Sequence, residues 1–365
     1  MTVLELSAAQ LGGKISRGEL TSAEVTAFFI ERIEKYNLDV NAVIDTRFDK
    51  ALTEAKLADE KRAAGSIDGP LHGVPMTIKD AFEVVGLTCD VGYPAFAGKV
   101  SKIDAAVVQR LKAAGAIIIG KTNTPLLCAD LQSYNDLHGT TNNPHNPAHT
   151  PGGSSGGSAA ALAAGFTPLE FGSDIGGSIR TPAHFCGLFG HKPTYGIIPA
   201  RGHVPPVHGA LTESALSVVG PLARSVDDIE LAVNLTLGLA GQEAAALKLN
   251  LPEARATKPK DLRVGLWPGD PYCPVDDEIS AGIARAAKTL EELGATIVDA
   301  RPDFTLAEHH EVYLMNLAPI IATGFPTAEI EKLAKTVENA APDDKSANII
   351  QARGALLAHR EWLVW

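Results

Sequence analysis

The residues most able to do chemistry lie in two glycine-rich turns, each built around serine. Residues 152–157 read GGSSGG, and residues 172–178 read GSDIGGS. Glycine has no Cβ, so a ligand can approach the hydroxyls closely. The consecutive N–H groups of Ile175, Gly176, Gly177 and Ser178 are spaced to converge on one oxygen, as an oxyanion hole requires. The helix expected next would point its N-terminus at the same place. A single such turn is better explained as a tight connection, but two of them in one window predict a site.

A serine nucleophile also needs a base, and none of the histidines is an obvious choice. Lys79 ends a short apolar segment, residues 73–80, that we interpret as a buried strand. An ordinary lysine has a pKa of about 10.4, and burial can lower that pKa by several units until the amine serves as a base. Taken alone, Lys79 is better explained by an ion pair or by a side chain that reaches the surface than by a role as a base.

Composition narrows the class of protein. The chain has 365 residues, of which 45% are hydrophobic and 21% charged, which is typical of a globular fold. Its formal net charge of −11 argues against nucleic acid as the main partner. No apolar stretch reaches the roughly 18 residues of a membrane helix, and the start lacks the basic segment of a signal peptide. We expect a cytoplasmic protein whose four widely spaced cysteines are free thiols.

Three short stretches have the spacing of known functional motifs, but the residues around them do not suit those motifs. Residues 115–122 match the phosphate-binding loop G-x-x-x-x-G-K-[ST], but the variable positions read AIII, a buried strand. Residues 152–156 match the nucleophile elbow G-x-S-x-G, but a loop precedes them where the elbow needs a strand. His145 and His149 have the spacing of metal ligands on a helix, which Pro144 and Pro147 forbid. We therefore expect no metal and no nucleotide cofactor.

The chain alternates between helical and strand patterns, which predicts α/β layers with a largely parallel sheet. Residues 121–153 are polar and rich in proline, so we interpret them as a long functional loop. The pattern predicts helices over 21–36, 104–114, 158–164, 225–237, 276–293 and 346–365, another from about residue 178, and strands over 73–80, 116–119, 169–171, 262–266 and 295–298.

Taken together, the two serine turns and the segments around them resemble the amidase signature family. The resemblance rests on residues 152–161, 172–183 and 187–196, supported by residues 73–80, 120–123 and 220–224. It extends over about residues 5–300. It implies an α/β fold with one large layered domain, in which helices flank a mixed, largely parallel central sheet. Within it we expect a helical segment over about 1–65, a catalytic core over about 66–240 and a C-terminal α/β part from about 262.

The resemblance also implies roles for the site residues. Ser178 is the expected nucleophile, Ser154 the bridging serine after a cis peptide bond with Gly153, and Lys79 the base. The oxyanion hole is expected from the N–H groups of Ile175 to Ser178. Ser155, Asp174 and Arg180 are expected to support the two turns. The implied reaction is hydrolysis of an amide C–N bond through an acyl-enzyme, with neither metal nor cofactor.

The resemblance has departures. Leu126 and His191 stand where many relatives carry glutamate and leucine. The chain is also shorter than the family leads us to expect, and its last helix pattern ends at Trp365 without a cap, which suggests C-terminal truncation.

Two other functions stay open at this point. One is the A-subunit role in an amidotransferase, that of a glutaminase working with partner subunits; residues 204–209 and 213–215 differ from that subfamily's usual sequence. The other is an inactive, truncated member. The expected partner is a small-molecule amide, with no nucleic acid and no membrane. A homodimer is left open. The substrate itself cannot be identified, although residues 126–150, 203–215 and 313–327 are expected to select it.

Overall fold

The computed structural model of the chain describes residues 2–205, 208–209, 213–323 and 325–364. Two compact units make up the chain, residues 1–249 and 250–365, where the sequence predicted one domain with a C-terminal part from about residue 262. The predicted turns and Lys79 all lie in the first unit. Within the described residues, no helix is both long enough and apolar enough to cross a bilayer.

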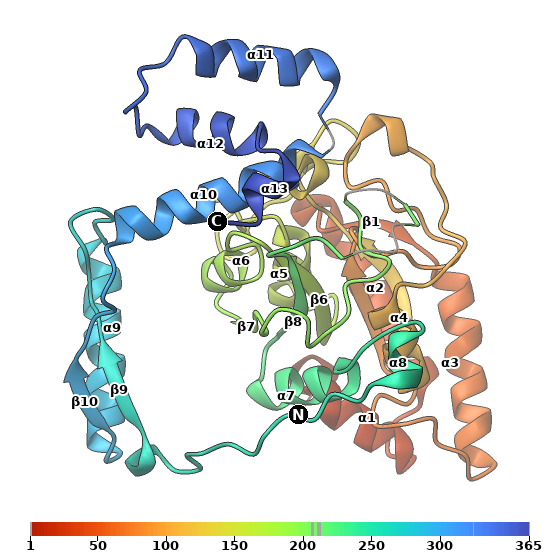
Figure 1. Ribbon diagram of the computed structural model, residues 1–365. Coiled ribbons are helices and arrows are strands. Elements are labelled where there is room, and N and C mark those ends of the chain that lie inside the picture. The colour runs from red at the N-terminus through yellow and green to blue at the C-terminus, as the bar shows by residue number, and fades with distance from the viewer. Residues whose placement is uncertain (1, 206–207, 210–212, 324, 365) are drawn as a thin grey trace. The chain divides into compact units, whose positions relative to one another are not determined.

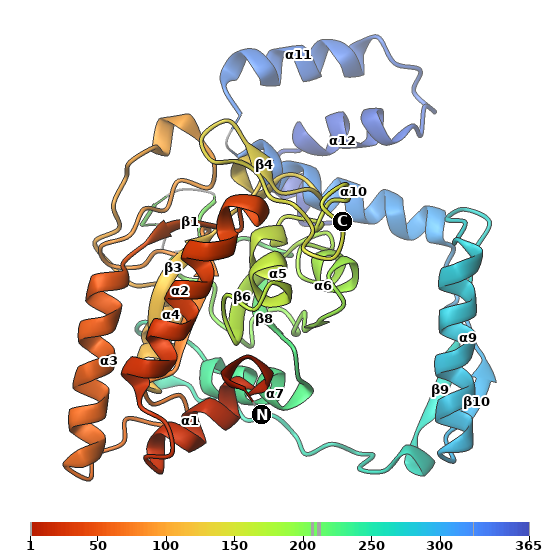
Figure 2. The same ribbon diagram turned by 180° about the vertical axis from the view of Figure 1, so that it is seen from behind.

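One sheet of the first unit carries Lys79. Its strands are β1 (Val43–Thr46), β3 (Ile117–Thr122) and β2 (Pro75–Lys79), in that order. β2 runs parallel to β3, and β1 runs antiparallel to it. The helices α2 (Ser22–Val40) and α3 (Phe48–Ala63) contact this sheet, whereas α1 (Ala8–Ser16) and α4 (Ala106–Ala113) contact α7 (Val226–Thr236). Figure 2 shows α2 crossing in front of the sheet.

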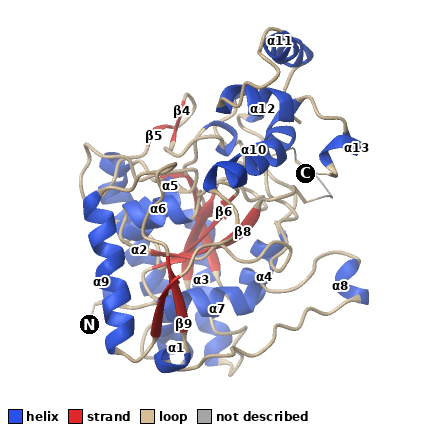
Figure 3. Cartoon of the chain, turned by 60° about the vertical axis from the view of Figure 1, so that its left-hand side comes forward, coloured by secondary structure: helices blue, strands red, loops and turns tan. Residues whose placement is uncertain are grey.

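A second sheet of the first unit carries the second serine-rich turn, whereas the first turn leads into α5 (Gly156–Ala163). Its strands are β6 (Leu169–Asp174), β8 (Val218–Ala223) and β7 (Phe189–Gly190), all antiparallel neighbours in that order. Figures 1 and 3 show β6 and β8 side by side next to α5. The other elements of this unit are α6 (Arg180–Phe185), α7 (Val226–Thr236), α8 (Glu243–Ala246), β4 (Tyr134–Asn135) and β5 (Gly139–Thr140).

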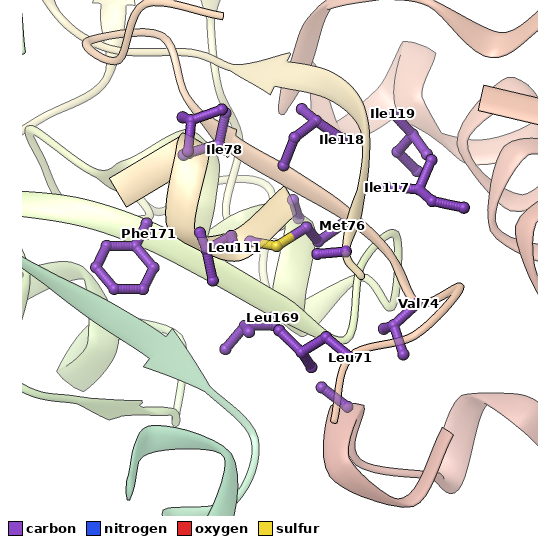
Figure 4. Packing of buried hydrophobic residues seen from close by; sticks show 14 of the residues in the cluster. Leu71, Val74, Met76, Ile78, Leu111, Ile117, Ile118, Ile119, Leu169 and Phe171 are labelled. Carbon is purple, nitrogen blue, oxygen red and sulfur yellow. The ribbon is translucent and has the colours of Figure 1, made fainter. Parts of the chain in front are cut away.

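A continuous apolar core joins the two sheets. Figure 4 shows Met76 and Ile78 of β2 packed with the isoleucines of β3, residues 117–119, and with Leu169 and Phe171 of β6. Each fully buried aliphatic or aromatic side chain of this kind contributes about 1.5–3 kcal/mol to folding. β2, β3 and β6 are buried along their whole length, so polar residues on these strands are shut away from water.

The second unit contains two groups of elements. β9 (Arg263–Leu266) and β10 (Thr296–Asp299) pair in parallel, and α9 (Asp277–Glu292) lies beside them (Figure 1). α12 (Ala347–Ala355) packs on both α10 (Leu306–Ala322) and α11 (Thr327–Glu338). An apolar pocket of about 380 Å³ lies among these three helices. The short α13 (His359–Trp362) follows, so the helix predicted over 346–365 is interrupted after Ala355.

The expected mixed α/β class is confirmed, with a larger share of antiparallel pairing than the alternation of elements suggested. Of the strand pairs described, β2–β3 and β9–β10 are parallel. The helix expected to begin near Ser178 begins at Arg180, because the N–H groups before it are bound by a side chain of the turn. Asp104 does not cap α4, which begins at Ala106; its carboxylate accepts instead from the N–H of Val85.

Candidate active site

Lys79 is the last residue of β2 and is fully buried. Its Nζ lies 2.7 Å from Ser154 Oγ and 2.9 Å from Ser173 Oγ, and donates to both. Among the described residues it forms no ion pair with a carboxylate. Burial is the largest influence on this amine and lowers its pKa below the ordinary value of 10.5. The surroundings of Lys79 therefore favour a neutral amine, which can accept a proton.

The first turn places Ser154 against this amine. The Gly153–Ser154 peptide bond is cis, as the family resemblance implied. Position 153 has no room for a side chain, because a Cβ there would lie 2.6 Å from the backbone nitrogen of Gln132. The neighbouring Ser155 joins the two turns, since its N–H donates to the carbonyl of Ser178 at 3.1 Å and its hydroxyl donates to the carbonyl of Ser173 at 3.3 Å.

The second turn is organised by Asp174 at the end of β6. Its carboxylate accepts from the backbone N–H groups of Gly177 at 2.9 Å and Ile179 at 3.0 Å. Arg180 adds a two-pronged ion pair to the same carboxylate, at 3.1 and 2.9 Å. Burial would raise the pKa of Asp174, but these donors hold it below its usual value. Asp174 and Arg180 thus bind each other and the backbone of the second turn.

The predicted oxyanion hole needs one correction. The N–H of Gly177 points to Asp174 and is not available for a substrate oxygen. Gly177 has a φ of +126°, a conformation that suits glycine and turns this N–H toward the carboxylate. In the described part of the chain, the N–H groups of Gly176 and Ser178 donate to no acceptor. They are the members of the predicted set that remain open to an oxyanion.

Ser178 lies in this turn and keeps 6% of its surface exposed. Within the described residues its hydroxyl makes no hydrogen bond. Of the two hydrogen bonds in the predicted relay, the one between Lys79 and Ser154 is therefore present, and the one between Ser154 and Ser178 is not. A hydroxyl that makes no hydrogen bond and lies beside two open N–H groups is suited to attack on a carbonyl carbon.

Three neighbours of Lys79 were missed by the sequence reasoning. Ser173 binds its amine directly, but the strand was expected to end at Phe171 and so gave no reason to single it out. The Cys128 thiol lies beside Lys79 and Ser154, and burial raises its pKa. His203 is half-buried near Lys79. Burial lowers its pKa to about 3, and the ring therefore stays neutral. All four cysteines are free thiols, as predicted.

A second buried lysine lies one strand away. Lys121 of β3 is fully buried, and its Nζ binds the Asp80 carboxylate at 3.0 Å and the carbonyl of Thr88 at 2.8 Å. The sequence reasoning had assigned it to the start of a polar loop after rejecting a phosphate-binding loop at residues 115–122. The rejection agrees with the structure, where this segment is the buried strand β3. Among the described residues, no group of three or more His, Cys, Asp or Glu side chains has the geometry to hold a metal ion.

Comparison with known proteins identifies the fold family. The sequence model of the amidase family matches residues 24–359. The chain belongs to the amidase family. This amidase-family chain is 43% identical over 234 residues to fatty-acid amide hydrolase 2-A of Danio rerio, which covers 62% of the chain and 44% of that protein. It is 37% identical over 313 residues to the A-subunit of glutamyl-tRNA(Gln) amidotransferase from Thermobifida fusca (strain YX), covering 84% of the chain and 61% of that protein.

Solved structures give the same answer. A bacterial aryl acylamidase of the amidase signature family superposes with a TM-score of 0.79 at 26% identity, covering 98% of this chain and 74% of that one. A fatty acid amide hydrolase superposes with a TM-score of 0.78 at 29% identity, covering 96% of this chain and 64% of that one. The chain spans 44% and 61% of the length of the two curated relatives named above.

Proposed function

We propose that this chain hydrolyses carboxylic amides with Ser178 as nucleophile, Ser154 as bridging acid–base and Lys79 as base. The observation that carries the proposal is the fully buried Lys79, held 2.7 Å from Ser154 Oγ without a carboxylate to keep it charged. The cis Gly153–Ser154 bond and the family match support the same assignment.

The proposed reaction moves one proton out along the relay and back again. The neutral Lys79 amine takes the Ser154 proton, and Ser154 takes the proton of Ser178. Ser178 Oγ bonds to the carbonyl carbon, and the carbonyl electrons move to its oxygen, which accepts from the N–H groups of Gly176 and Ser178. As the C–N bond breaks, the leaving amine receives the proton from the relay. Water then attacks the ester on Ser178 and frees the acid.

The decisive test is Ser178→Ala, assayed with an anilide whose aryl amine absorbs light. We expect hydrolysis to fall to the background rate, and mass spectrometry of the wild-type chain to find an acyl group on Ser178. The matched control is Ser66→Ala, an exposed serine far along the chain from either turn, which should leave the rate unchanged. Full activity in Ser178→Ala would refute the assignment.

A second candidate is a glutaminase that supplies ammonia to a partner. It is favoured by the similarity to amidotransferase A-subunits, which extends over 84% of this chain. The two functions differ in substrate and share the relay. Release of ammonia from glutamine only after partner subunits are added would favour the second, whereas hydrolysis of simple anilides by the chain alone favours the first.

A further inference from the structure

Glu170 is a fully buried carboxyl group that the proposed mechanism does not use. It lies on β6, and the hydroxyl of Thr77 on β2 donates to its Oε1. Its Oε2 makes no hydrogen bond of good geometry among the described residues, although the Thr122 and Ser158 hydroxyls lie beside the carboxyl. No arginine, lysine or histidine of the described chain pairs with it. A carboxylate in such a place would be a buried, uncompensated charge, which is very costly.

The physical consequence is a carboxylic acid that keeps its proton. Burial raises the pKa of Glu170 to about 8, against an ordinary value of 4.5. The hydrogen bond from Thr77 acts in the opposite direction but is outweighed. The hydroxyls of Thr122 and Ser158, which lie 2.9 Å apart, are the neighbours able to accept the acid's proton.

Glu170 is connected to Lys79 along both strands. Thr77, which binds Glu170, stands two residues before Lys79 on β2, so the two side chains lie on the same face about 7 Å apart along the strand. Ser173, which binds Lys79, stands three residues after Glu170 on β6. A shift of Glu170 would therefore move both the strand that ends in the base and a hydroxyl that holds the base.

We propose that Glu170 is a positioning residue for Lys79: its hydrogen bond with Thr77 holds β2 against β6 next to the base. Because Glu170 is a neutral acid, it does so without placing a negative charge there. The proposal rests on the proposed role of Lys79 as the base. A carboxylate at this place would favour the ammonium form of Lys79 and so oppose its function.

Few other charges face this pair. Lys79 of β2 is the titratable neighbour of Glu170, while α5 and β8 carry no ionisable side chain. His203 lies near Lys79, and burial lowers its pKa, so its ring is neutral. Asp174 at the end of β6 and the Cys128 thiol face Lys79 itself, and both act to raise its pKa. Asp174 is already bound to Arg180. Replacing Glu170 by the amide of the same shape therefore tests the charge of this one group.

The test compares Glu170→Gln with Glu170→Ala in the 365-residue chain. With an anilide substrate, we expect Glu170→Ala to lower kcat about tenfold or more, because a small displacement of a base weakens proton transfer strongly. Glu170→Gln should restore most of that loss. The acid limb of its kcat/KM profile should keep the wild-type midpoint to within about 0.3 pH unit. Glu230→Gln, the same change at an exposed glutamate of α7, is the matched control.

Two outcomes would overturn the proposal. A midpoint for Glu170→Gln lying about one pH unit or more below wild type would show that Glu170 is ionised and acts as a counter-charge. A wild-type kcat in a folded Glu170→Ala would show that it positions nothing.

An infrared titration separates this proposal from the proposed function. A protonated carboxyl band present at pH 7 in the wild-type chain should vanish in Glu170→Gln, whether or not the chain turns over. A band unchanged in Glu170→Gln would contradict the neutral acid, whereas an active Ser178→Ala would contradict only the catalytic assignment. If Glu170→Gln does not fold, Thr77→Val replaces it. This variant removes the donor to Oε1, whose hydrogen bond lowers the pKa of Glu170, so the protonated carboxyl band should disappear at a higher pH than in wild type. A band that disappears at the wild-type pH would count against the proposal.

Discussion

Lys79 and Lys121 lie on the neighbouring parallel strands β2 and β3, where Lys79 is paired in register with Thr122 and Ile78 with Lys121. Both side chains are fully buried. Lys79 meets hydroxyls, and burial lowers its pKa. Burial acts on Lys121 in the same direction, but the Asp80 carboxylate, with further help from Cys89 and Asp45, reverses the effect and raises its pKa.

The difference lies in what each amine touches. Burial penalises an ammonium ion at both positions, and only an adjacent anion can compensate for it. Lys121 has that anion 3.0 Å away and is a structural cation. Lys79 has hydroxyls in the corresponding place, and its pKa is lowered, as the proposed role of a base requires. The pair shows that depth of burial alone does not assign a lysine a role.

The largest effect that would separate them is on catalysis. Lys79→Met should lower kcat/KM for an anilide by about 10²–10⁴-fold, the usual contribution of a positioned base. The chain should still melt cooperatively, because an apolar side chain suits the site at least as well as an unpaired amine. A folded Lys79→Met with wild-type kcat/KM would contradict the comparison on the side of Lys79.

The next effect is on stability. Lys121→Met leaves the Asp80 carboxylate buried without its cation, and loss of one partner of a buried pair costs about 3–5 kcal/mol of unfolding free energy. Denaturant titration measures it. The double variant Asp80→Asn with Lys121→Met should recover part of the loss, since the amide can still accept from the N–H of Val91. Additive losses in the double-mutant cycle would show that the ion pair is not the cause.

The sequence predicted one lysine of this pair and missed the other for a physical reason. Lys79 stood out because it ends an apolar segment and because the serine turns required a base. Lys121 begins a polar stretch that was interpreted as loop, yet the strand continues to Thr122 and buries it. Local polarity cannot show that a carboxylate next to the neighbouring strand pairs with the lysine.

Long-range partners limited the other predictions in the same way. Ser225 caps α7 through a local contact with the N–H of Asp228. The Asp228 carboxylate does not return a bond to this cap and accepts from the N–H groups of Ala8 and Ala9, some 220 residues away. The site serines were predictable because glycine spacing is local, whereas Ser173 became a neighbour of Lys79 only through the packing of β6 against β2.

A smaller effect appears in the pH dependence of stability. The folded-state pKa of Lys79 lies below 10.5, so between these two values the unfolded chain binds more protons and the free energy of unfolding rises with pH. Lys79→Met lacks this dependence. Its stability relative to wild type should therefore fall as the pH rises toward 10.5, by at most about 1.4 kcal/mol per pH unit.

Lys121 should behave in the opposite way. Its folded-state pKa is raised, so its contribution is fully present below about 10.5 and is lost only as the pH rises through the folded-state value. Between pH 7 and 10, Lys121 itself should therefore add no slope to the difference in unfolding free energy between wild type and Lys121→Met. Parallel slopes for the two lysine variants over that range would remove the electrostatic distinction between the sites.

The smallest effect concerns the two hydroxyls that hold Lys79. Ser173→Ala removes one of them and leaves the 2.7 Å contact with Ser154, which lies on the proposed proton path. A single hydrogen bond contributes about 0.5–1.5 kcal/mol, so kcat/KM should fall only about two- to tenfold. Since the lost acceptor also stabilised the ammonium form, the acid limb of the profile should move to lower pH. Ser173→Thr, which keeps the hydroxyl, is the control. A loss as large as that of Lys79→Met would instead place Ser173 on the proton path.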